Sequence, residues 1–142
     1  LEELWNRIIF SILVSNTDDH LRNHNFILSE QGWKLAPLFD VNPNPFGKEL
    51  SLNITENNNL KRLSLAMDTA KYYNLSFEKA KSNAIHIATI VKDNWRKLAK
   101  VNGCSNVEIE RMKSAFEDES ILIKQNKKNE KEIDIDKFLK SY

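Results

Sequence analysis

The sequence contains very little cysteine, glycine and proline. Its 142 residues include a single cysteine, Cys104, together with three glycines and three prolines. One cysteine excludes an intramolecular disulfide and a cysteine metal cluster, and it suits a reducing compartment, so we expect a cytoplasmic protein. Three widely spaced glycines, Gly32, Gly47 and Gly103, cannot form a glycine-rich phosphate-binding loop.

Net charge and long hydrophobic stretches are also lacking. Twenty-one basic and 20 acidic residues give a formal net charge of +1, so charge gives no reason to expect binding to nucleic acid or to an anionic membrane. No stretch approaches the roughly 18 apolar residues that span a bilayer. No basic region precedes the first apolar run, as it would in a signal peptide. We therefore expect neither nucleic acid nor a membrane as a direct partner.

The spacing of apolar residues predicts a mainly α fold with one small β-hairpin. From Leu1 to about Val14 apolar residues recur every three to four positions, as in a helix buried along one face. Two short apolar runs, Phe26–Leu28 and Trp33–Leu35, flank a loop that contains glycine and predict the hairpin. The segment APLFDVNPNPFG follows, and its three prolines predict irregular backbone.

Capping residues predict two helices after about residue 60. Ser64 is the expected N-cap of a helix over Leu65–Tyr73. Ser76 is the expected N-cap of a long helix that runs to about Ala99. That helix should end before Gly103, because glycine is the usual residue just past a helix C-terminus.

The sequence SNVE, Ser105–Glu108, is a capping box that predicts a last helix to about Phe116. We assign residues 1–118 to one helical domain. Residues 119–142 are mostly charged and form an extension that is either a solvated helix or partly disordered.

The octet NTDDHLRN, residues 16–23, carries the polar side chains with the strongest functional signal. Phosphoryl transfer from ATP needs a carboxylate that accepts the hydroxyl proton, a hard oxygen ligand nearby, and a second carboxylate for Mg²⁺. Asp18, Asn23 and Asp40 supply these groups, in this order and with a predicted hairpin before the last, as in protein kinases. We expect Asp18 to be the base and the other two to bind the metal. His20 should hold the loop by hydrogen bonding.

The same octet allows two simpler interpretations. Asn and Asp favour caps and turns, so the residues can be a polar turn at the end of the first helix. His20 and His24 stand four residues apart and, with Asp18, can be read as the zinc site of a hydrolase, although the glutamate of zinc proteases is missing between them. We expect Asp19 to be a solvated or capping residue and His24 to have no chemical role.

The octet and the downstream APLFD together resemble the HipA-like serine/threonine kinases, the toxins of bacterial toxin–antitoxin pairs. The loop pattern of that family is N-x-D-x-H-x-x-N, and its second metal-binding segment is (S/T/A)-P-x-(Y/F)-D. The matching positions are Asn16, Asp18, His20 and Asn23 in the first pattern and Pro37, Phe39 and Asp40 in the second. The continuation VNPNP is also similar, and the resemblance extends from about Leu4 to Phe116.

This resemblance implies a helical kinase C-terminal lobe. It implies Asp18 as catalytic base with His20 in the same loop, and Asn23 and Asp40 as Mg²⁺ ligands, with Mg²⁺ and ATP as cofactors of the full-length protein. It also implies a helix-turn-helix antitoxin as partner and a protein substrate, with an aminoacyl-tRNA synthetase as a candidate. In the family, the phosphate-binding loop and the nucleotide-pairing lysine lie in an N-terminal lobe. We therefore expect a fragment that is inactive alone.

Two other functions stay open at the level of sequence. One is a non-catalytic helical interaction module that retains a kinase-like loop. The other is a fragment of a lipid or small-molecule kinase, because phosphoinositide kinases also use a D-x-H-x-x-N loop. The near-neutral charge gives no support for a membrane substrate, and the continuation PLFDVNPNP favours the HipA-like interpretation.

Overall fold

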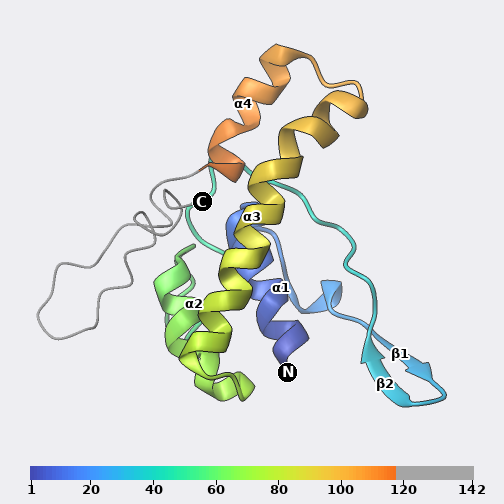
Figure 1. The fold of residues 1–142 in the computed structure, drawn as a ribbon, viewed down its shortest axis with the longest axis vertical. Coiled ribbons are helices and arrows are strands. Elements are labelled where there is room, and N and C mark those ends of the chain that lie inside the picture. The colour runs from blue at the N-terminus through green and yellow to red at the C-terminus, as the bar shows by residue number, and fades with distance from the viewer. Residues whose placement is uncertain (118–142) are drawn as a thin grey trace, which may run out of the picture.

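A computed structural model of the chain describes residues 1–117, so the predicted extension over residues 119–142 lies outside the described part. The fold is mainly α with one two-stranded hairpin, as predicted (Figure 1). No helix in residues 1–117 is long and apolar enough to cross a bilayer. In chain order the elements are α1 (Glu2–Leu13), the 3-10 helix η1 (Leu21–Asn23), β1 (Phe26–Ser29), β2 (Gly32–Leu35), α2 (Leu63–Thr69), the 3-10 helix η2 (Ala70–Tyr73), α3 (Phe77–Val101) and α4 (Asn106–Phe116).

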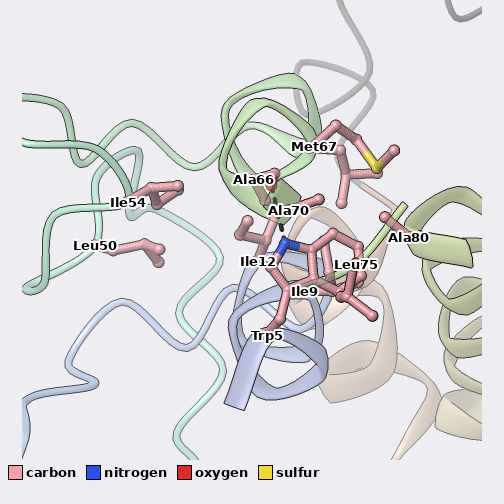
Figure 2. Close-up of a cluster of buried hydrophobic side chains, with 11 residues drawn as sticks. Trp5, Ile9, Ile12, Leu50, Ile54, Ala66, Met67, Ala70, Leu75 and Ala80 are labelled. Atoms are coloured by element: carbon pink, nitrogen blue, oxygen red, sulfur yellow. Dashed lines mark hydrogen bonds between the residues drawn. The ribbon is translucent and has the colours of Figure 1, made fainter. Parts of the chain in front are cut away.

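Helix α1 packs against α2 and α3 and supplies the centre of the hydrophobic core. Trp5, Ile9 and Ile12 lie on one helical face and are fully buried, which confirms the predicted apolar stripe. The indole Nε1 of Trp5 donates a hydrogen bond of 2.9 Å to the carbonyl of Ala66 in α2, drawn as a dashed line in Figure 2. Apolar burial and a satisfied indole together fix α1 against α2.

Replacing Trp5 with Phe should lower the free energy of unfolding by about 1–3 kcal/mol, because a buried hydrogen bond is lost and the smaller ring leaves a cavity. The Ala66 carbonyl keeps the Thr69 hydroxyl as a donor. Trp33→Phe is the matched control, since Trp33 on β2 is 72 % exposed; it should change the free energy by about 0.5 kcal/mol or less. Urea unfolding followed by circular dichroism measures both values. Equal losses in the two variants would contradict a structural role for the Trp5 hydrogen bond.

Local capping explains where α3 begins and ends and where α4 begins. The Ser76 side chain accepts the N–H of Lys79 at the start of α3. Gly103 follows the end of this helix with a left-handed φ of 86°, a conformation that glycine adopts without strain. Ser105 and Glu108 form the reciprocal capping box of α4. Both predicted caps and the predicted terminal glycine are thus confirmed.

The predicted N-cap of α2 is wrong. The helix begins at Leu63 with the extended residue Arg62 at the N-cap position, so Ser64 lies inside the first turn. Leu63 is buried in the core, and its burial draws the helix start upstream of the serine. The helix predicted to run to Tyr73 consists of two elements. The α-helix α2 ends at Thr69, and the tighter 3-10 helix η2 continues to Tyr73.

The β-hairpin projects away from the helices (Figure 1). Its strands pair antiparallel with Leu28 opposite Trp33, and both side chains are exposed in the described part of the chain. The buried guanidinium of Arg7 on α1 donates a hydrogen bond of 2.6 Å to the carbonyl of Ala36, directly after β2. This bond holds the base of the hairpin, and the segment that leads to Asp40, against α1.

Candidate functional site

The polar octet forms a tightly turned loop between α1 and β1. Ser15, which precedes it, has a left-handed φ of 53° and is fully buried. Its hydroxyl donates to the carbonyl of Ala115 near the end of α4 (2.7 Å) and accepts from Nζ of Lys61 (2.8 Å). The start of the loop is therefore fixed by two segments that are distant in the sequence.

Asn16 joins the octet to the segment that follows the hairpin. Its buried side-chain Oδ1 accepts the backbone N–H of Asn42 (3.0 Å), and Asn16 also forms an isolated bridge with Pro43. Asp18 and Asp40 each lie two residues from this contact. The contact thus brings the segments that carry the two candidate carboxylates together, a role beyond ordinary turn chemistry.

Close backbone approach at Thr17 supports the same arrangement. A Cβ added at Gly47 would lie 2.5 Å from Cγ2 of Thr17, so only glycine fits there. The Thr17 hydroxyl also accepts from Nδ2 of Asn44 (3.1 Å), and its carbonyl accepts from the backbone N–H of Ser51 (3.0 Å). Residues 44–51 therefore hold the residue that directly precedes Asp18.

The two candidate carboxylates are exposed. Asp40 adopts a left-handed φ of 55°, which aspartate tolerates better than most residues. Its Oδ1 accepts from Nδ2 of Asn42 (2.7 Å). Within residues 1–117, no hydrogen bond joins Asp18, Asn23 and Asp40 to one another, although their segments are linked through Asn16. Asp18 and Asp40 are therefore open to solvent or to a ligand.

Unpaired polar atoms are concentrated in the second half of the octet. Five buried side-chain nitrogens in the described part of the chain lack a hydrogen-bond partner, and three belong to His20, Asn23 and His24. Buried polar atoms are nearly always paired, so these three nitrogens are the polar groups of the octet region that other atoms of residues 1–117 leave unsatisfied. Asn23 itself is only 5 % exposed, and the unpaired atom of its carboxamide is the nitrogen Nδ2.

Asp19 and His24 form a contact that sequence reasoning missed. Asp19 is buried, not solvated, and its Oδ1 lies 2.8 Å from Nε2 of His24. Its Oδ2 accepts from the buried Ser11 hydroxyl of α1 (3.1 Å). We call the carboxylate–imidazole contact the Asp19–His24 clamp. The available signal was Ser11: a serine within the apolar run IIFSILV needs a polar partner once it is buried.

The clamp changes the roles expected for the two histidines. The imidazole that closes the loop by hydrogen bonding is His24, whereas Nδ1 of His20 has no partner. Residues 1–117 hold no group of three His, Cys, Asp or Glu side chains arranged to bind a metal ion, which leaves the zinc interpretation without support. The oxygens of Asn23 and Asp40 are instead hard donors of the kind Mg²⁺ prefers.

A pocket of about 520 Å³ opens beside Asp18, and we call it the Asp18 pocket. Thr17 and Asp18 form one wall, residues 42–46 the second, and Glu108, Arg111 and Met112 of α4 the third. Figure 1 shows the irregular segment after β2 running to the C-terminal end of α4 and back to α2. The Ser114 hydroxyl donates to the carbonyl of Pro45 (3.0 Å), which fixes α4 against this segment.

Comparison with known families identifies the domain. The family model of the HipA-like C-terminal domain matches residues 1–118, a range that contains the octet, Asp40 and every element described above. No curated protein and no solved structure matches the chain. The match covers most of the 142 residues, and the chain therefore belongs to the HipA-like C-terminal domain family.

Proposed function

We propose that this chain is the C-terminal catalytic lobe of a HipA-like protein serine/threonine kinase. The observation that carries the proposal is the hydrogen bond between the Asn42 N–H and Oδ1 of Asn16. It joins the loop that bears Asp18 to the segment that bears Asp40, the two carboxylates that a kinase needs in one site. Membership in the HipA-like family supports the same conclusion.

Asp18 acts as the general base in this proposal. Its exposed carboxylate lines the Asp18 pocket, so a hydroxyl in that pocket can reach it. The acceptor oxygen forms a bond to the γ-phosphorus, the bond from that phosphorus to the β,γ-bridging oxygen breaks, and ADP leaves. The hydroxyl proton passes to Asp18, a contribution of about 10²–10⁴ in rate.

Asn23 and Asp40 would hold Mg²⁺. Both side chains offer hard oxygen donors, and Asn42 orients the Asp40 carboxylate. Mg²⁺, when bound, neutralises charge on the phosphates. The Asp19–His24 clamp keeps the loop that carries Asp18, His20 and Asn23 in shape.

A kinase also needs a phosphate-binding loop and a lysine that pairs with the phosphates. Three scattered glycines cannot supply that loop, so we propose that another part of the same protein provides both. We further propose that the protein is a toxin neutralised by a helix-turn-helix antitoxin. Its proposed substrate is a protein, with an aminoacyl-tRNA synthetase as candidate.

Transfer of labelled γ-phosphate tests this proposal. The full-length protein, incubated with Mg²⁺ and γ-labelled ATP, should label serine or threonine on itself or on added protein, as read by mass spectrometry. Label in phosphoinositide vesicles but not in protein would favour a lipid kinase. No label with a folded, antitoxin-free protein would favour a non-catalytic interaction module.

Asp40→Ala should raise the Mg²⁺ concentration for half-maximal activity by at least about tenfold. Even the loss of a group that only supports a metal ligand commonly costs about 10–100-fold in metal affinity or activity. Asp93→Ala removes an exposed carboxylate from α3 and is the matched control. Magnesium titration of the phosphotransfer rate gives both values. A shift shared by the two variants, or absent from both, would contradict the ligand role of Asp40.

A further inference from the structure

We propose that Lys61 is a positioning residue of the phosphotransfer site, acting through Ser15 on the loop that bears Asp18. The inference rests on the proposed kinase function and adds to it a residue that lies away from the reacting groups. Lys61 is neither in the octet nor in the lining of the Asp18 pocket, and it lies in the segment just before α2. Its side chain is buried, and Nζ donates a hydrogen bond of 2.8 Å to the Ser15 hydroxyl.

The chemistry of the ammonium group fixes the direction of the hydrogen bonds at Ser15. An ammonium donates and cannot accept. The Ser15 oxygen therefore accepts from Lys61, and its own hydrogen is left for the Ala115 carbonyl, 2.7 Å away. That carbonyl is among the last of α4, at the negative end of the helix dipole. The ammonium, the hydroxyl and the end of α4 thus form one chain in which each bond polarises the next. We call these three residues the Ser15 junction.

The main chain of Ser15 connects the junction to both segments that carry candidate carboxylates. Its carbonyl accepts the backbone N–H groups of Thr17 and Asn44, both at 2.9 Å. The first bond shapes the turn that leads to Asp18, and the second holds the segment that follows Asp40. A displacement of Ser15 therefore shifts the candidate base relative to the second carboxylate. Misplacing a reacting group by about 1 Å can lower a rate by about 10²-fold.

Both ends of the Ser15 junction are fixed to helices. Lys61 precedes the buried Leu63 of α2 by two residues, and its backbone N–H donates to the Lys48 carbonyl (3.1 Å). At the other end, Phe116 of α4 stacks on Trp95 of α3 with ring centroids 4.6 Å apart. The junction therefore ties the start of the octet to two helices whose places are set by core packing and ring stacking.

Two features of the Ser15 junction cost folding free energy. Lys61 is 4 % exposed, and an ammonium loses its hydration when it is buried, a cost that an apolar side chain of similar size does not carry. Ser15 has a left-handed φ of 53°, a conformation that is uncommon outside glycine. Local costs of this kind are typical of functional sites that the surrounding structure holds in shape. Their coincidence three residues before Asp18 favours a positioning role over a purely stabilising one.

Lys61→Met in the full-length protein tests the inference, because methionine keeps the length of the side chain but cannot donate to Ser15. The kcat for phosphoryl transfer should fall by about 10–100-fold, with the KM for ATP and the thermal midpoint close to wild type. Ser15→Gly removes the hydroxyl while suiting the left-handed φ, and it should show the same fall in kcat. The double variant should lose no more than either single variant, because both substitutions break the same chain of bonds.

Lys48→Met is the matched control, since Lys48 is exposed and only its backbone carbonyl contacts Lys61; its kcat should equal that of wild type. Hydrogen exchange followed by mass spectrometry gives a second readout that does not depend on activity. In folded Lys61→Met, the amides of residues 16–23 should exchange at least about tenfold faster, while those of α3 and all those of Lys48→Met stay unchanged.

The inference is overturned by a wild-type kcat in folded Lys61→Met or Ser15→Gly, even if either variant is less stable, because that pattern belongs to a purely structural contact. It is also overturned by unchanged exchange over residues 16–23 in Lys61→Met. A wild-type protein that transfers phosphate to nothing overturns the proposed function instead, and the exchange result then decides the role of Lys61 alone.

Discussion

Asp18→Asn should lower phosphoryl transfer by the full-length protein by about 10²–10⁴-fold, the contribution expected from general base catalysis. The carboxamide keeps the size and shape of the side chain but cannot accept the hydroxyl proton. Within residues 1–117 the Asp18 side chain is exposed and makes no hydrogen bond, so its replacement removes no hydrogen bond that holds the fold. The loss should therefore fall on kcat, with the thermal midpoint unchanged.

Asp93→Asn makes the same chemical change at an exposed position on α3 and should leave kcat intact. Autophosphorylation measured under single-turnover conditions separates the chemical step from product release. Growth inhibition by the full-length protein provides a second readout of the same loss. If Asp18→Asn retained wild-type rates in both assays, Asp18 would not be the base. The result would favour the interpretation of the octet as a polar turn.

The features that sequence predicted well depend on residues close together in the chain. The apolar stripe of α1 follows from a repeat of three to four residues, and the caps at Ser76 and Ser105 act within a single helical turn. Ser64 was a locally reasonable cap, but Leu63 belongs to the core that α2 shares with α1. Burial of a leucine outweighed a capping hydroxyl, and no local pattern reveals that balance.

The candidate site also has features that are local in the sequence and features that depend on contacts between distant residues. The order Asp18, Asn23, Asp40 is a property of spacing and can be read from the sequence. The bonds that assemble the site are not local: Asn16 reaches Asn42 across 26 positions. Ser15 reaches Ala115 across 100 positions. The third wall of the Asp18 pocket, α4, therefore cannot be placed beside the octet from sequence alone.

Asp19→Ala should lower the free energy of unfolding by about 2–4 kcal/mol. Both Asp19 and His24 are largely buried, with side chains 13 % and 12 % exposed, and Ser11 is 2 % exposed. The substitution removes the acceptor of two buried groups, and each group left unsatisfied costs about 1–3 kcal/mol. Urea unfolding measures the loss. His86→Ala, at an exposed histidine on α3, is the control for loss of an imidazole and should be near neutral.

A double-mutant cycle decides whether the Asp19–His24 clamp acts as a unit. If it does, the losses of Asp19→Ala and His24→Ala should overlap in the double variant, with a coupling of about 0.5–3 kcal/mol. The clamp spans residues 19–24 and so encloses Asn23, the candidate metal ligand. Opening it should therefore also raise the Mg²⁺ concentration for half-maximal phosphotransfer at temperatures where the variant is fully folded. Additive losses would show that the contact at 2.8 Å carries no coupling. A stability loss with an unchanged magnesium response would limit the clamp to folding and leave Asn23 to be positioned by its own burial.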